Sequence, residues 1–348
     1  METIIRKHAK IYPQMQPTDA VKLLYQSEFG PGHIVKDKES AKAFLFAEAE
    51  KTPEEASMPL FTEIGGGFAR LNLASPDIKK LPLSLFAAIF VASAKEKTGS
   101  VASFEEKLEL LKKLTAEGIF AFSTEELENY LANYKKNGYP PVSHSKEYHD
   151  AYLPAYRVVN ERFIRLIPLM EKINETLAEK GKMTLAIDGR CGSGKSTAAE
   201  MLAEIYDANL VRMDDFFLPP SLRSNERYAE AGGNIHYERF LVEAAPFLKE
   251  KKPFRYRVFD CSVMDYGGEA VASDKPLTIV EGVYSLHTLW RDVFDLKVFF
   301  DIEKETQKER LIKRNGDYYR VFEEKWIPLE EAYFAGMAVR EACEMIIK

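Results

Sequence analysis

The pattern of hydrophobic and polar positions changes character about halfway along the chain. Before residue 180 the apolar positions recur mostly at helical spacing, whereas beyond residue 183 short apolar runs alternate with segments rich in helix formers. Such an alternation predicts a parallel sheet that is covered by helices on both faces. We therefore expect a mainly helical domain over residues 1–180 and an α/β domain over residues 181–348.

The first half is predicted to contain helices and one small hairpin. Thr18 is placed to cap a helix that Gly30 ends. Three glycines inside an alternating stretch predict the hairpin over 62–73. Further helices are expected over 39–50, 82–94, 104–116, 124–136 and, kinked or divided by Pro154 and Pro168, 146–180. Capping boxes at Ser103–Glu106 and Ser123–Glu126 begin the third and fourth of these.

The second half is predicted to alternate strand and helix. The expected strands cover 183–187, 209–213, 255–260, 277–280 and 296–300. The expected helices cover 195–206, 237–250, 304–314 and 329–346. In an open parallel sheet ligands bind at the carboxyl ends of the strands, so the residues that follow each strand are the first candidates for chemistry.

The most informative stretch is 183–197, which reads MTLAIDGRCGSGKST. A short buried strand is followed by the pattern G-x-x-x-x-G-K-[ST] and then by helix formers, which is the order that a phosphate-binding loop requires. The expected nucleotide-binding residues are Gly189, Arg190, Cys191, Gly192, Ser193, Gly194, Lys195, Ser196 and Thr197. Backbone N–H groups and Lys195 would bind the phosphates of ATP, and the Ser196 hydroxyl would bind Mg²⁺.

Acidic side chains follow two other predicted strands. Asp214 and Asp215 end one strand, and one of these carboxylates could accept the proton of an attacking hydroxyl or bind Mg²⁺ through water. An ordinary helix cap is the structural alternative for both. Glu281 follows a second strand and is expected to support Mg²⁺, partly through water, unless it is simply a carboxylate at a strand end.

Two arginines lie four residues apart on one face of the predicted helix 304–314. Arg310 and Arg314 could close over a transferring phosphoryl group and stabilise its charge. The alternative is a basic helix face that water covers. Lys313, on the same helix, is assigned to that solvated face.

Together these stretches resemble the uridine kinase and phosphoribulokinase family of P-loop kinases, which is similar to the bacterial pantothenate kinases. The resemblance covers about 183–340. It rests on the phosphate loop, on Asp214-Asp215-Phe216-Phe217, on Glu281-Gly282 and on the arginine-bearing helix. It implies a P-loop NMP-kinase-like fold, transfer of the γ-phosphoryl group from ATP-Mg²⁺ to a small-molecule alcohol, and Asp214 as general base with Asp215 as its neighbour.

The chain departs from uridine kinases where that family binds the nucleoside. In the corresponding stretch Phe259, Met264 and Tyr266 stand in place of the family's tyrosine, histidine and arginine. A site that hydrogen-bonds a base should not lose its donors without cost, so the acceptor is left open. The candidates for a different acceptor pocket are Asp215, His236, Glu238, Asp260 and Tyr266, and a structural role is equally open for them.

Two stretches of the first half are rich in polar and aromatic residues. They cover 25–33 and 143–157 and could form two walls of one ligand site, although loop chemistry with an aromatic core is the favoured interpretation. A metal site at His33, His144 and His149 is a weaker alternative, because no close ligand pair supports it. Cys191 could be a redox switch if the helix dipole and Lys195 lower its pKa.

Composition and charge indicate which partners and which cellular compartment the protein is expected to have. The 348 residues are 46% hydrophobic and 29% charged, which is ordinary for a soluble protein, and the net charge of −6 argues against a nucleic-acid partner. No apolar run is long enough to cross a bilayer, and three widely spaced cysteines fit a reducing cytoplasm. A homo-oligomer is left open. The alternative function is a nucleotide-dependent ATPase or switch whose helical domain binds a protein or RNA partner.

Overall fold

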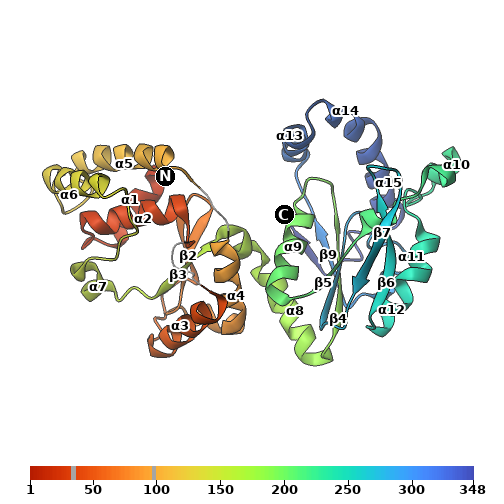
Figure 1. Cartoon of the computed structure of the whole chain (residues 1–348), viewed down its shortest axis with the longest axis horizontal. Coiled ribbons are helices and arrows are strands. Elements are labelled where there is room, and N and C mark those ends of the chain that lie inside the picture. Colours follow the sequence, from red (N-terminus) through yellow and green to blue (C-terminus); the bar gives the residue numbers. More distant parts are fainter. Residues whose placement is uncertain (33–36, 96–98) are drawn as a thin grey trace. The chain divides into compact units, whose positions relative to one another are not determined.

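The chain divides into two units (Figure 1). The computed structural model describes residues 1–32, 37–95 and 99–348. The units are Met1–Ile167 and Pro168–Lys348. The division therefore falls at the start of helix α8 (Ile167–Lys180) and not at its end, where the sequence pattern changes.

The core of the first unit lies among four helices. These are α1 (Glu2–Ile11), α2 (Pro17–Phe29), α5 (Val101–Ala116) and α6 (Thr124–Lys136), and the unit also holds α3 (Lys38–Lys51), α4 (Leu83–Ala94) and α7 (Lys146–Tyr152). Phe104 of α5 is fully buried in this core. Its ring lies 5.3 Å from that of Phe29 and 5.5 Å from that of Tyr139. The Phe29 ring is tilted against that of Phe104 and the Tyr139 ring is edge-on to it, and such aromatic pairs stabilise a core beyond the area that they bury.

The sequence predicts three helix N-caps, and the structure has one of them. Ser123 caps α6 through the predicted capping box. Helix α2 begins instead with a capping box between Gln16 and Asp19, and the Thr18 hydroxyl donates to the carbonyl of Ser143. Helix α5 is capped by Ser100, so the predicted box at Ser103–Glu106 is wrong. Ser100, three residues earlier, accepts from the Ser103 N–H and extends the helix by one turn.

The first unit also contains a three-stranded antiparallel sheet in the order β1-β2-β3. Strands β1 (Phe61–Gly65) and β2 (Phe68–Asn72) confirm the predicted hairpin. Strand β3 (Tyr156–Asn160) interrupts the helical region that was predicted over 146–180, and that prediction is wrong. Pro154 ends the helical path, and Val158 and Val159 are β-branched residues that pack well in a sheet.

The second unit is built on a parallel sheet in the order β10-β9-β4-β8-β5. Its strands are β4 (Met183–Gly189), β5 (Asn209–Arg212), β8 (Leu277–Glu281), β9 (Leu296–Phe300) and β10 (Met345–Ile347). Its helices beyond α8 are α9 (Lys195–Tyr206), α10 (Asn225–Ala229), α11 (Tyr237–Glu243), α12 (Ala245–Glu250), α13 (Lys304–Asn315), α14 (Tyr319–Val321) and α15 (Ile327–Gly336). All residues of β4 are buried, as a central parallel strand requires.

Three expectations for the second unit need correction. The strand expected over 255–260 lies outside the parallel sheet, in an antiparallel pair formed by β6 (Phe254–Asp260) and β7 (Asp265–Ala272). The helix expected over 237–250 divides into α11 and α12, because Pro246 opens the second of them. The helix expected over 329–346 ends at Gly336, and the chain returns as edge strand β10.

Replacing Phe104 by alanine should destabilise the first unit by about 3–5 kcal/mol, because a fully buried ring leaves a cavity. The matched control is Phe44→Ala, since Phe44 is 72% exposed, and it should change stability by less than about 0.5 kcal/mol. Amide hydrogen exchange in α2 and α5 of the full chain measures both changes. Equal protection in the two variants would contradict this view of the core.

Candidate active site

The phosphate loop lies between β4 and α9, as the sequence predicts, and its backbone needs glycine. Gly189 has φ +137°, and a Cβ there would lie 2.1 Å from the carbonyl oxygen of Phe300 in β9. Gly192 and Gly194 also have positive φ, at +76° and +93°. The loop therefore curls back onto the start of α9, where helix N–H groups favour an anion. Lys195, the first residue of α9, is 8% exposed.

Two oxygen-bearing side chains meet beside this loop. The Ser196 hydroxyl donates to a Glu281 carboxylate oxygen at 2.8 Å. They meet because β8 pairs with β4, which sets Ile187 opposite Glu281. Burial raises the pKa of Glu281, while Lys195 and the hydrogen bond from Ser196 oppose the shift. A hydroxyl and a carboxylate are ligands that Mg²⁺ accepts together with nucleotide phosphates, so this pair fits the expected metal.

Asp214 and Asp215 follow β5 and have different surroundings. The Asp214 side chain is exposed. Desolvation by the surrounding protein nevertheless raises the pKa of its carboxyl group, and the charges of Lys195 and Arg212 oppose that rise. Asp215 accepts a hydrogen bond from the Tyr256 hydroxyl at 3.2 Å. Burial raises the pKa of Asp215 too. Asp214 is therefore the acid that is open to an incoming group, and Asp215 is tied to β6.

Both predicted arginines of α13 are near the loop. Arg310 donates to the carbonyl oxygen of Gly192 at 3.1 Å. The Arg314 guanidinium lies 5.6 Å from the centre of the Phe322 ring. Its positive charge is one of those that oppose the rise in the pKa of Asp214. Both guanidinium groups are exposed, and Arg310 contacts the loop, whereas Arg314 acts on the Asp214 carboxylate through its charge.

The predicted acceptor residues do not all come together. His236 lies with its Nδ1 3.2 Å from the Tyr266 hydroxyl. Glu238 instead pairs with Arg227 at 2.8 Å. Asp260 accepts hydrogen bonds from Ser262 within its own turn between β6 and β7. The contacts of Glu238 and Asp260 fit a structural role, whereas His236 and Tyr266 form a pair beside β6.

Sequence reasoning missed Arg239, which joins that pair to the acids. Its guanidinium is buried, stacks between the rings of Phe216 and Tyr266 at 4.5 and 5.0 Å, and donates to the carbonyl oxygen of Asp215. It thereby connects the turn after β5 to α11. No local motif marks an arginine in this role, because its partners lie far away in the sequence.

Sequence reasoning also missed the contacts that brace the loop from α15. The Cys191 N–H donates to Glu330 at 3.0 Å, and Arg190 pairs with Glu331 at 2.6 Å. Burial raises the pKa of the Cys191 thiol to about 12. The predicted lowering by the helix dipole is therefore wrong, because a buried thiol beside Glu330 disfavours the thiolate.

The metal site proposed for the first half receives no support. His33 lies outside the described residues, and His144 bonds to Asp19 and to Tyr156. Across residues 1–32, 37–95 and 99–348, no group of three His, Cys, Asp or Glu side chains is arranged to hold a metal ion. Within the same residues no helix is both long enough and apolar enough to cross a membrane.

The second unit has a P-loop α/β fold, because a parallel five-stranded sheet carries the phosphate loop between β4 and α9. No protein-family model matches the chain, and no curated protein does. Among solved structures it is similar to a possible uridine kinase from Bacillus stearothermophilus, with 19% identity, TM-score 0.42, and coverage of 54% of this chain and 100% of the other.

Two further structures are similar to part of the chain. A candidate fructose transport system kinase from Silicibacter sp. has 20% identity and TM-score 0.38, over 51% of this chain and 97% of its own. A shikimate kinase from Acinetobacter baumannii, in complex with shikimate, has 16% identity and TM-score 0.26, over 49% of this chain and 86% of its own.

Replacing Gly189 by alanine should disrupt the phosphate loop, because the new Cβ would overlap the carbonyl oxygen of Phe300. The matched control is Gly316→Ala: Gly316 also has positive φ, at +56°, but a Cβ there would meet no atom within 4 Å. The control should cost about 1–2 kcal/mol from φ alone, and Gly189→Ala clearly more. Thermal unfolding compares them, and equal costs would refute the steric argument.

Proposed function

We propose that this protein is a kinase that transfers the γ-phosphoryl group of ATP to a hydroxyl of a small molecule, with Mg²⁺. One observation carries the proposal: at one edge of the sheet, three neighbouring strands lead into the phosphate loop, end in Glu281, and lead into the turn that holds Asp214. Phosphoryl transfer needs a phosphate cradle, a metal support and a base close together, and this edge offers all three.

Each residue has a part in the proposed transfer. Bound ATP and Mg²⁺ would supply the phosphoryl group and neutralise its charge. Lys195 and the loop N–H groups bind the phosphates, while Ser196 and Glu281 hold the metal, the latter partly through water. Asp214 accepts the proton of the acceptor hydroxyl. Its exposed side chain supports that assignment over Asp215, which Tyr256 engages.

The acceptor would lie beyond Asp214. We assign Asp215, His236 and Tyr266 to its pocket, because Arg239 connects the Asp215 turn to the Tyr266 ring. Glu238 and Asp260 belong to the scaffold around it. The arginines Arg310 and Arg314 would bind the transferring phosphoryl group from α13.

Lys195→Ala and Asp214→Asn should each abolish phosphoryl transfer, and Asp214→Asn should largely spare ATP binding. A positioned base contributes about 10²- to 10⁴-fold in rate, so Asp215→Asn is the matched control and should lose less. ADP release is measured with nucleosides, pantothenate, sugar phosphates and glycerate as acceptors. Turnover like that of the unmodified chain in Asp214→Asn would remove the base assignment.

The same assay separates a kinase from a nucleotide-driven switch. A kinase should hydrolyse ATP slowly alone and accelerate with the right alcohol, whereas a switch needs no acceptor. Rapid ADP release that no acceptor increases would favour the switch.

Arg310→Gln and Arg314→Gln should each lower turnover by about 10²-fold or more, as expected for groups that stabilise transition-state charge. Lys313→Gln is the matched control, since Lys313 is an exposed cation on the same helix. Steady-state kinetics of the three variants test this, and an equal loss in all three would show a general effect of charge instead.

A further inference from the structure

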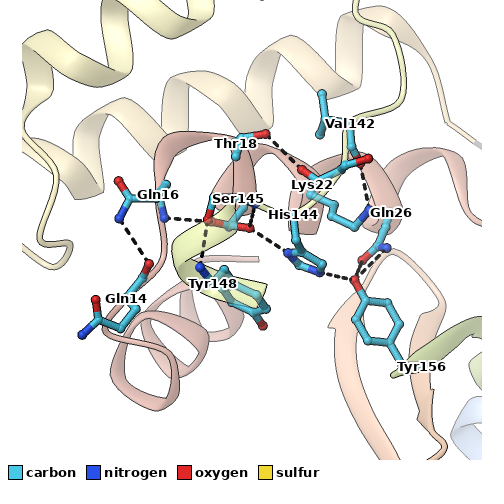
Figure 2. A network of polar contacts seen from close by, with 12 residues as sticks. Gln14, Gln16, Thr18, Lys22, Gln26, Val142, His144, Ser145, Tyr148 and Tyr156 are labelled. Carbon is cyan, nitrogen blue, oxygen red and sulfur yellow. Dashed lines mark hydrogen bonds and ion pairs between the residues drawn. The ribbon is translucent and has the colours of Figure 1, made fainter. Parts of the chain in front are cut away.

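A chain of hydrogen bonds in the first unit links Gln26, Tyr156 and His144 (Figure 2). It ends at the buried acid Asp19. The side chain of Asp19 is fully buried and accepts from His144 Nδ1 at 2.7 Å and from the Ser145 N–H at 3.0 Å. Burial lowers the pKa of His144 to about 4, so the ring is neutral near pH 7. Because a carboxylate only accepts, His144 donates from Nδ1 and keeps the lone pair on Nε2.

The Tyr156 hydroxyl donates a hydrogen bond to that lone pair on His144 Nε2. This hydroxyl lies 2.6 Å from His144 Nε2 and accepts from the Gln26 amide at 3.2 Å (Figure 2). The Asp19–His144 pair therefore orients the phenol in the way that an acid and a histidine orient a reactive hydroxyl.

A buried cation lies at the other end of this chain. Arg70 is 3% exposed, donates to Gln26 Oε1 at 3.1 and 2.9 Å, and lies 4.4 Å from the centre of the Tyr156 ring. Buried Asp19 and buried Arg70 are thus joined through three neutral side chains. Burying two separated charges costs free energy, and a purely structural role does not account for that cost.

This chain borders a cavity of about 500 Å³ within the first unit, which is in the range of small-molecule sites. Lys22, Gln26 and His144 line it from the α2 side and from the segment before α7, and Tyr156 and Arg157 line it from β3. The two polar stretches noted in the sequence therefore contribute to one cavity.

The charged groups at the cavity are mainly cations. The Lys22 ammonium donates to the Val142 carbonyl at 2.8 Å, which leaves two of its three donors for another partner. Arg157 pairs with Glu48 through Nη1 at 2.7 Å. Phe44, on the cavity wall, is 72% exposed, so a large aromatic surface faces outward there.

We propose that this cavity binds a small organic anion, a carboxylate or a phosphate ester that carries a flat apolar group. Lys22 and Arg157 bind the acidic group, and Phe44 and Phe90 pack against the apolar part. Tyr156, whose hydroxyl proton is donated to His144, contributes its ring to the wall of the cavity. The site lies wholly in the first unit and is independent of the proposed kinase activity.

The test uses the full chain with Lys195→Ala, so that the phosphate loop contributes no binding. Benzoate and phenyl phosphate are the probes, and phenol and inorganic phosphate are the controls, all followed by isothermal titration and ligand-observed NMR at millimolar concentration. One or both aromatic anions should bind, and the stronger of the two identifies the acidic group. Absence of binding by both would overturn the proposal.

Variants locate the binding. Lys22→Met should weaken binding of the probe by about tenfold or more, as expected when a charged hydrogen bond to the anion is lost. Lys146→Met is the matched control, since Lys146 is an exposed lysine of the same unit, and it should leave affinity unchanged. Melting temperatures confirm that the variants fold. Unchanged affinity in folded Lys22→Met would refute the site.

Affinity should fall as pH rises from 7 to 9, because burial lowers the pKa of Lys22 to about 8 and its charge is lost in that range. Lys22→Arg keeps the charge and should flatten this dependence. The other titratable or charged groups around Lys22 are Asp19, Arg70, His144, Tyr156 and Arg157. An unchanged pH profile in Lys22→Arg would assign the dependence to one of these and exclude Lys22 as the anion-binding cation.

Discussion

The second unit depends on the buried carboxylate of Asp188, at the end of β4. It accepts hydrogen bonds from the Gly189 N–H at 2.7 Å, the Leu286 N–H at 2.9 Å and the Tyr333 hydroxyl at 2.8 Å. Burial raises its pKa to about 6, and these donors oppose the shift. One acid thus holds together the phosphate loop, the segment after β8 and α15. The loop geometry follows from this constraint.

The first unit uses the same device with a different outcome. Asp19 is also fully buried and satisfied by several donors, but one of these is a histidine that faces a cavity. At Asp188 every donor belongs to the scaffold, so the acid holds the backbone. At Asp19 the hydrogen bonds lead through His144 to Tyr156, so the acid orients a side chain. The two buried acids therefore differ in what their donors contact: an acid whose donors all lie in the packed interior holds the backbone, whereas an acid whose donor faces a cavity orients a side chain there.

The parts of the site that the sequence predicts share a physical reason. Ser196 and Lys195 follow a strand and open a helix, so local order alone places them beside phosphates. Glu281 and Asp214 end strands, and parallel strands present their carboxyl ends at one edge. The assignment of 255–260 to the same sheet failed because an alternating run pairs equally well with the neighbouring hairpin strand. Strand order is decided by packing, which periodicity does not encode.

The sequence by itself determined the phosphate loop, its lysine and serine, and the order of strands and helices around them, because these rest on contacts between near neighbours. Only the tertiary structure decided which acids are free and which are engaged. Tyr256, Arg239, Glu330 and Tyr333 reach their partners across the fold, and so do His144 and Arg70 in the first unit. Side chains distant in sequence meet only after the cores have packed, and their chemistry is set by the burial that packing produces.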